Sequence, residues 1–207
     1  MITVSEETRR MQDMMKMYSM GGMDMSAFGA TGETLVLNAN HPLVKYVLEH
    51  EPVVDALERD ITDYLTQMSS SEMSESLTTR HTGLLHACTD IERIGDHGET
   101  LAKRARKLVE DDVVFSDEAK AELLQLSEMV LRASGRSLED KVIAEDAVRL
   151  CREVKQYQKE IRKNHITRLN EHICNPTAGF VMMELLINMK RVSDHSKNIA
   201  QLVQGTF

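Results

Sequence analysis

The chain has 207 residues, of which 42% are hydrophobic, 28% charged and only 4% aromatic, with three prolines and no tryptophan. This length can bury a substantial core, and this composition favours helices. The formal net charge of −8 gives no overall attraction to nucleic acid or to an anionic membrane, so nucleic acid is not an expected partner.

The cysteines and the apolar segments indicate the compartment. Cys88, Cys151 and Cys174 are odd in number and far apart, so they suggest neither a disulfide framework nor a thiolate zinc site. The longest apolar stretch, 179–189, contains Glu184 and is too short to span a bilayer. We therefore expect a soluble protein in a reducing cytoplasm.

Six helical segments are predicted along the chain. The first is expected at about 5–18, with Ser5 as its N-cap, and a long connection rich in glycine and methionine follows at 19–40. Seven methionines fall within 11–25, which indicates an apolar surface that packs on a partner or on the core rather than a metal site.

The second helix is expected from Pro42 to about Met68, with a kink or restart near Glu51 because Pro52 follows. Apolar residues recur along it at helical spacing, so it should bury one face. These are Val47, Val54, Leu57, Ile61, Leu65 and Met68.

Four further segments are predicted to be helical. A capping box at 69–72 would open the third helix, which reaches about Val109, and Ser116 would cap the fourth. The fifth is expected at about 138–172, and the sixth runs from Pro176 until Gly205 ends it. Strand-type alternation is absent, so the fold class is an all-α bundle of about six long helices.

An internal repeat organises these helices. VSEET at residue 4 matches FSDEA at 115, ERDI (58–61) matches QKEI (158–161), and DIERIGDHGETLA (90–102) matches NMKRVSDHSKNIA (188–200). The sequence therefore predicts one domain over 1–207, built from two pseudo-symmetric three-helix repeats at about 4–110 and 115–205.

Carboxylates form a stripe on the third helix. Glu92, Asp96 and Glu99 are spaced by four and three residues, so they share one helix face, where like charges repel. Oxygen ligands at this spacing suit a hard cation such as iron, manganese, magnesium or calcium. The alternative is a solvated stripe, partly neutralised by Lys103.

The second copy of this motif is altered. Asp194 matches Asp96, but Lys190 and Lys197 replace Glu92 and Glu99, so Asp194 can pair within its own helix and contributes at most one metal ligand.

Three residues of the motif recur unchanged: Arg93, Asp96 and His97 return as Arg191, Asp194 and His195. The histidines are expected to cap or bridge between helices. Arg93 is expected to pair with an acidic residue of a neighbouring helix, such as Asp60 or Asp63.

The two motifs on long helices of a duplicated three-helix unit resemble the PhoU family, over about residues 42–204. The resemblance implies an all-α regulator of phosphate uptake that is not an enzyme. Family E/DxxxD motifs are associated with iron or other metal ions. The first motif corresponds to Glu92 and Asp96, whereas the second keeps only Asp194.

The order of the helices suggests a narrower resemblance. A helix precedes the one at 42–68, and none follows the second motif before Phe207, which looks like the cytoplasmic C-terminal domain of a sodium-dependent phosphate cotransporter. This would place the protein at the inner face of the membrane, with a membrane transporter domain or the phosphate-transport machinery as partner, and as a homodimer.

Two alternatives remain. The chain could be a stand-alone PhoU-like regulator of phosphate signalling. It could also be a carboxylate-bridged di-metal enzyme, although such sites use Glu-x-x-His pairs and the sequence contains none.

Overall fold

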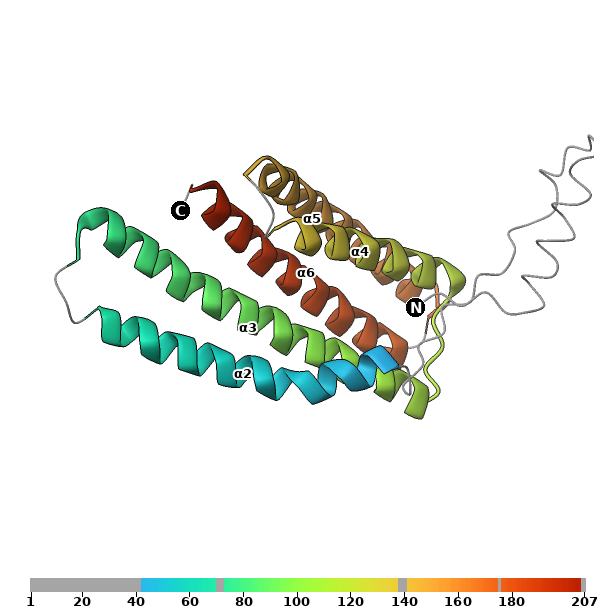
Figure 1. Ribbon diagram of the computed structural model, residues 1–207. Coiled ribbons are helices and arrows are strands. Elements are labelled where there is room, and N and C mark those ends of the chain that lie inside the picture. Colours follow the sequence, from blue (N-terminus) through green and yellow to red (C-terminus); the bar gives the residue numbers. More distant parts are fainter. Residues whose placement is uncertain (1–41, 70–72, 138–140, 175, 206–207) are drawn as a thin grey trace, which may run out of the picture. The chain divides into compact units, whose positions relative to one another are not determined.

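The computed structural model describes residues 42–69, 73–137, 141–174 and 176–205, with backbone only at 42–44. This part of the chain contains five helices and no strand, so the all-α prediction is confirmed (Figure 1). The helices are α2 (Pro42–Met68), α3 (Glu75–Glu110), α4 (Asp117–Arg136), α5 (Lys141–Asn170) and α6 (Pro176–Gln204). The helix predicted at 5–18 and the connection at 19–40 lie outside the described residues.

The helix limits follow local capping chemistry. Ser116 caps α4 as predicted, because its hydroxyl oxygen accepts the Ala119 N–H at 3.3 Å. The predicted start of α3 is wrong, since Ser74 is the cap and its hydroxyl oxygen accepts the Leu77 N–H. The helix α2 continues through Pro52 without a restart. No described helix is long and apolar enough to cross a membrane.

The helices α3 and α6 form the centre of the bundle. The helix α2 packs on α3, α5 packs on α6, and α4 lies against α5 and α6 (Figure 1). Arg104 contacts Glu184 at one end, and Gly83 faces Leu202 at the other, so α3 and α6 are antiparallel. A Cβ on Gly83 would lie 2.6 Å from Leu202 Cδ1, so a larger residue at this position would make the Leu202 side chain shift.

Two histidines connect the central helices in a symmetric manner. His97 Nδ1 lies 2.9 Å from Asn188 Oδ1, and His195 Nδ1 lies 2.7 Å from Asp90 Oδ1. His195 follows His97 by 98 positions, and Asn188 follows Asp90 by the same interval. The predicted bridging role of both histidines is confirmed, and the sequence repeat appears in space as a pseudo-twofold axis between α3 and α6.

The predicted buried face of α2 is only partly correct. Leu65 is buried and Val47 and Val54 are half-buried, but Leu57 is 54% exposed and Ile61 46% exposed. The helical spacing of the apolar residues predicted that they share one side of α2, but it could not show which of them pack against α3.

The exposed row of α2 has a counterpart that is covered. Leu57 and Tyr64 correspond to Tyr157 and Asn164 of α5, 100 positions later. The Tyr157 hydroxyl donates to Gln125, and the Asn164 amide donates to Glu122, both on α4. On α5 this side of the helix is covered by α4. The exposed apolar row lies on the corresponding side of α2.

A buried histidine lies on different helices in the two repeats. His81 Nε2 lies 2.7 Å from the Leu65 carbonyl oxygen. The corresponding residues of the second repeat are Gly179 and His165, and a Cβ on Gly179 would lie 3.1 Å from His165 Nε2. The imidazole thus comes from α3 in the first repeat and from α5 in the second. His165 is 1% exposed, and neither ring nitrogen has a hydrogen-bond partner among the described residues.

Replacing His165 by Leu, the residue of the first repeat, should stabilise the protein. The change removes a buried polar group without a partner, a feature that costs about 1–3 kcal/mol. Burial and Arg168 lower the His165 pKa from its ordinary value of 6.5, and Glu122 opposes them. As the pH drops below 6.5, His165 is protonated in the unfolded state but stays neutral in the folded state. The stability of the wild-type protein therefore falls.

Urea unfolding between about pH 5 and pH 8 tests this prediction. The His165→Leu variant should be more stable and should lose less stability on acidification. The exposed His50→Gln variant is the control. Equal pH slopes for wild type and His165→Leu would contradict the prediction.

Candidate metal centre

Carboxylates from two helices meet in the groove between α2 and α3. Carboxylate oxygens of Glu51, Asp55 and Asp96 all lie within 4.8 Å of one another, and all three residues are half-buried. Asp96 belongs to the predicted stripe. Glu51 and Asp55 were not predicted, although they repeat the E-x-x-x-D spacing of Glu92 and Asp96, and that spacing is the signal that would have identified them.

The packing of α2 against α3 positions these groups. A Cβ on Gly95 would lie 3.6 Å from Val54 Cγ1, and the Cys88 thiol lies 3.8 Å from the Glu58 carbonyl oxygen. Within each helix the two acids, Glu51 and Asp55 or Glu92 and Asp96, are four positions apart, so both project from one side at successive turns. The two stripes therefore converge on the same groove.

The remaining predicted ligands of the first repeat border this cluster. Burial raises the Glu92 pKa, and the neighbouring Asp96 charge raises it further. Burial and the Asp55 charge raise the Glu51 pKa, with smaller contributions from Glu99 and Asp96. These five carboxylates form one electrostatic unit.

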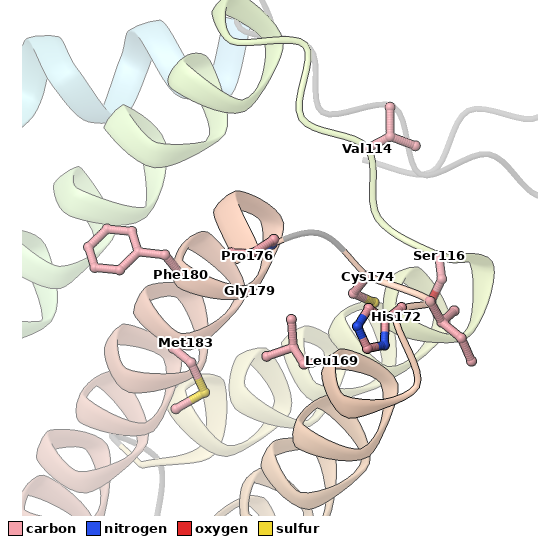
Figure 2. A pocket seen from close by; sticks show the side chains of 10 residues that line it. Val114, Ser116, Leu169, His172, Cys174, Pro176, Gly179, Phe180 and Met183 are labelled. Atoms are coloured by element: carbon pink, nitrogen blue, oxygen red, sulfur yellow. The ribbon is translucent and has the colours of Figure 1, made fainter.

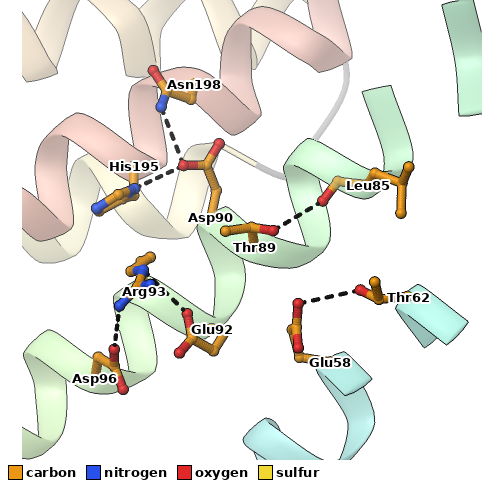
Figure 3. A network of polar contacts seen from close by, with 10 residues as sticks. All are labelled: Glu58, Thr62, Leu85, Thr89, Asp90, Glu92, Arg93, Asp96, His195 and Asn198. Atoms are coloured by element: carbon orange, nitrogen blue, oxygen red, sulfur yellow. Dashed lines mark hydrogen bonds and ion pairs between the residues drawn. The ribbon is translucent and has the colours of Figure 1, made fainter. Parts of the chain in front are cut away.

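Cations neutralise this unit only in part. Arg93 lies 3.0 Å from Asp96 and 3.4 Å from Glu92 (Figure 3), so the expectation that it would reach a neighbouring helix is wrong. Lys103 lies 2.6 Å from Glu99. Within the described ranges, no cationic side chain forms an ion pair with Glu51 or Asp55.

The second repeat does not reproduce the cluster. Lys190 forms an ion pair with Asp194, as its spacing suggested. Cys151 and Lys155 stand where the first repeat has Glu51 and Asp55. Asp194 joins no metal-ligand group among the described residues, so the structure does not bring it to the other predicted ligands.

The donor set favours a hard cation. All the groups of the cluster are carboxylates, which suit magnesium, calcium, manganese or iron rather than a soft metal. Cys88 lies nearby on α3, but burial raises the pKa of its thiol, which keeps it protonated and a poor ligand. The residues present therefore fit the metal ion that the sequence suggested.

A second concavity, of about 860 Å³, lies where the end of α5 meets the start of α6 (Figure 2). Its lining is largely apolar, with Leu169, Phe180 and Met183, and its polar members include His172 and Cys174. Among the described residues that line it there is no carboxylate, so these residues offer no ligands for a hard cation.

Comparison with known proteins identifies the family. The model of the PhoU domain matches residues 18–105 and 121–203, which is most of the chain. The chain belongs to the PhoU family. The family resemblance predicted from the two motifs is thereby confirmed.

Relatives and solved structures agree with this assignment. The phosphate-specific transport system accessory protein PhoU homolog of Pseudomonas aeruginosa is 24% identical over 176 residues, covering 81% of this chain and 71% of that protein. The homolog of Pseudomonas putida is 26% identical over 178 residues, covering 82% and 68%.

Two crystal structures share the fold. PhoU from Pseudomonas aeruginosa superposes with a TM-score of 0.64 at 21% identity, covering 81% of this chain and 82% of that one. The phosphate transport system regulatory protein PhoU from Streptococcus pneumoniae gives a TM-score of 0.65 at 16% identity, covering 80% and 79%. These matches do not support the narrower resemblance to a cotransporter tail.

Charge repulsion among these carboxylates yields a stability prediction. Glu51→Gln removes a charge that has no ion-pair partner in the described part of the chain, so the variant should be more stable at neutral pH by about 0.2–0.5 kcal/mol. The raised pKa means that the folded state favours protonated Glu51. The stability that wild-type protein gains from protonated Glu51 is therefore present below the ordinary pKa of 4.5 and is lost as the pH rises through the raised pKa.

Urea unfolding in the presence of a chelator, at several pH values, measures this effect. The Glu160→Gln variant, which changes an exposed acid of α5, serves as the control. A Glu51→Gln variant less stable than wild type in chelator would show that the groove carries no net repulsion.

Proposed function

We propose that this protein is a non-enzymatic accessory regulator of phosphate transport that binds a hard metal ion between α2 and α3. The convergence of Glu51, Asp55 and Asp96 within 4.8 Å is the observation that carries the metal site. Membership of the PhoU family and the printed names of the relatives support the link to phosphate transport. The relatives favour an accessory protein over a transporter tail.

The carboxylates have defined roles in this proposal. Glu51 and Asp55 of α2 and Asp96 of α3 would supply the oxygen ligands, while Glu92 and Glu99 would complete the coordination or accept bonds from bound water. The ion would be iron or another divalent or trivalent metal. It would convert repulsion between two helices into a link between them, so occupancy would change how firmly α2 is held on α3.

The architecture connects this groove to the rest of the bundle. Asp96 and His97 are neighbours on α3, and His97 binds Asn188 of α6. A change in the position of α3 therefore reaches the second repeat through a direct contact. This supports a regulatory role, in which the protein would report metal occupancy to the phosphate-transport machinery at the cytoplasmic face of the membrane.

A di-metal oxidase is the weaker alternative. The ligand group contains no histidine, whereas such enzymes pair glutamates with histidines one turn away on the same helix. Arg93, which is paired with Glu92 and Asp96, also reduces the negative charge that two adjacent metal ions require. The proposed site suits binding better than oxygen chemistry.

Elemental analysis tests the metal site. Wild-type protein incubated with Mn²⁺ or Fe²⁺ and then desalted should retain metal, and the Asp55→Ala/Asp96→Ala double variant should retain at least tenfold less, because each helix loses a ligand. The Asp194→Ala variant is the matched control and should behave as wild type. The Glu92→Ala/Asp96→Ala variant removes ligands of α3 alone. Comparing its metal content with that of the Asp55→Ala/Asp96→Ala variant separates the contribution of the predicted stripe from that of the α2 ligands.

Two results would contradict the site. Retention of metal by the Asp55→Ala/Asp96→Ala variant would place the ion elsewhere. Absence of metal from wild type after loading would reduce the five carboxylates to a solvated surface.

A further inference from the structure

Charge is divided unevenly between α2 and α5, which occupy corresponding positions in the two repeats. The helix α2 carries two basic and six acidic residues, a formal net charge of −4. The helix α5 carries eight basic and four acidic residues, a formal net charge of +4. Among the described residues the two helices do not contact each other. The net charge of −8 for the whole chain therefore conceals a negative edge at α2 and a positive edge at α5.

Four cations form a row along α5. They follow one another at intervals of three, four and three residues, so they share one side of the helix. They are Arg152, Lys155, Lys159 and Arg162. All four are exposed, and within the described part of the chain none of them forms an ion pair with a carboxylate. Their charges are therefore available to groups outside the molecule.

Acidic residues border this row without neutralising it. Glu145 lies seven positions before the first cation and marks where the row begins. Glu153 is held by Arg149. Glu160 follows Lys159 by one position, so it projects about 100° away around the helix. Over about 15 Å of helix, the row presents only positive charge.

The row lies on the side of α5 that faces away from α4. Tyr157 and Asn164 mark the side that meets α4, because both form hydrogen bonds with side chains of that helix. Lys155 and Arg162 each precede one of these residues by two positions, which is about 200° around the helix. The helix α4 therefore leaves the row uncovered.

Large apolar side chains lie on the same side of the second repeat. Ile166 continues the row of cations and is 48% exposed. On α6, Ser196 bonds to α4, and Ile187 stands nine positions earlier, about two and a half turns, on the opposite side. Phe180 precedes Ile187 by seven positions and shares its side. Phe180 is 64% exposed and Ile187 50% exposed.

These side chains form one surface, because α4 packs against both α5 and α6 and they all face away from it. We call this surface the basic face. It consists of Arg152, Lys155, Lys159, Arg162, Ile166, Phe180 and Ile187. Long cationic side chains beside exposed apolar groups are typical of proteins that lie on an anionic bilayer, since the cations attract the headgroups and the apolar groups enter the headgroup region.

We propose that the basic face binds the surface of an anionic phospholipid membrane. An acidic protein partner is less well matched, because protein partners are recognised mainly through side chains held in well-packed pockets. Within the described residues, no hydrogen bond or ion pair holds the four cations in place. A fluid array of headgroups requires no fixed geometry, only positive charge and exposed apolar groups at one level.

The charge distribution also defines the orientation of the bound protein. An anionic surface attracts α5 and repels α2, so the molecule binds with its positive edge towards the lipid and its negative edge away from it. The carboxylate cluster between α2 and α3 then remains in contact with solvent. The attraction falls as salt screens the charges.

Sedimentation with vesicles in the presence of a chelator tests the proposal. The 207-residue chain should bind phosphatidylcholine vesicles that contain about a quarter phosphatidylglycerol, and binding should weaken between about 50 mM and about 500 mM NaCl. Pure phosphatidylcholine should bind far less. The Lys155→Gln/Lys159→Gln/Arg162→Gln variant should bind the anionic vesicles about tenfold or more weakly, because each cation near the surface adds to the attraction.

The matched control removes three exposed cations from other helices. Arg59, Arg80 and Arg132 lie on α2, α3 and α4, and none of them forms an ion pair within the described ranges. The Arg59→Gln/Arg80→Gln/Arg132→Gln variant has the same net charge as the test variant and should bind as wild type does.

A fluorescence measurement identifies the surface that touches lipid. The chain contains no tryptophan, so a single introduced tryptophan reports on its own position. Emission of the Ile166→Trp variant should shift to shorter wavelength on anionic vesicles, because the indole enters the headgroup region. Emission of the Leu131→Trp variant, changed at a 71% exposed position of α4, should not shift.

Three results would overturn the proposal. Wild type could fail to bind anionic vesicles at low salt, or bind neutral vesicles equally well. The triple variant of α5 could bind as tightly as wild type, which would place the lipid elsewhere. If that variant fails to fold, the Ile166→Trp variant decides, and unchanged emission on anionic vesicles would overturn the proposal. No metal or phosphate is present, so these failures are separate from failure of the proposed function.

Discussion

The antiparallel contact between α3 and α6 is the constraint on which the other features depend. Gly83 allows the helices to approach at one end, and the two histidine bridges fix their register around the pseudo-twofold axis. His97 and His195 also stack, with ring centroids 5.6 Å apart. Because these contacts fill the inner sides of both helices, the outer sides remain available for α2 and α5. The place where α2 meets α3, and with it the carboxylate cluster, therefore follows from how the central pair is joined.

Duplication gives the two repeats the same frame and allows the chemistry of their surfaces to differ. His97 and His195, which join the helices, occupy matching positions in the two copies, whereas three of the five carboxylates of the first repeat correspond to lysines in the second. The second repeat also uses polar contacts between α4 and α5, notably the ion pair between Arg168 and Glu122, where the first repeat has apolar side chains on α2. The frame is thus fixed by a few buried groups, and the exposed positions around it carry the differences in function.

Much of this could be predicted from the sequence, and the failures have physical causes. The repeat, the all-α class, the Ser116 cap and the bridging histidines follow from local patterns that need no knowledge of packing. The buried face of α2 does not, because apolar spacing at Leu57 and Ile61 cannot reveal which neighbour is present. Glu51 and Asp55 could have been recognised by their spacing, but only the fold shows that they meet Asp96. The predicted ion-pair partner of Arg93 was wrong because acidic residues of its own helix are nearer than those of other helices.

The exchanged imidazole has a consequence for how the two repeats came to differ. A Cβ at 179 would lie 3.1 Å from His165 Nε2 and 3.2 Å from Leu169 Cδ2, so the site has room for an imidazole from position 165 or from position 179 but not for both. These two positions could therefore not have drifted independently. The interior of the bundle thus restricts the order of permissible mutations, whereas Glu92, Glu99 and their counterparts Lys190 and Lys197 are only half-buried and are less constrained by packing. Burial therefore decides which positions of the two repeats had to change together.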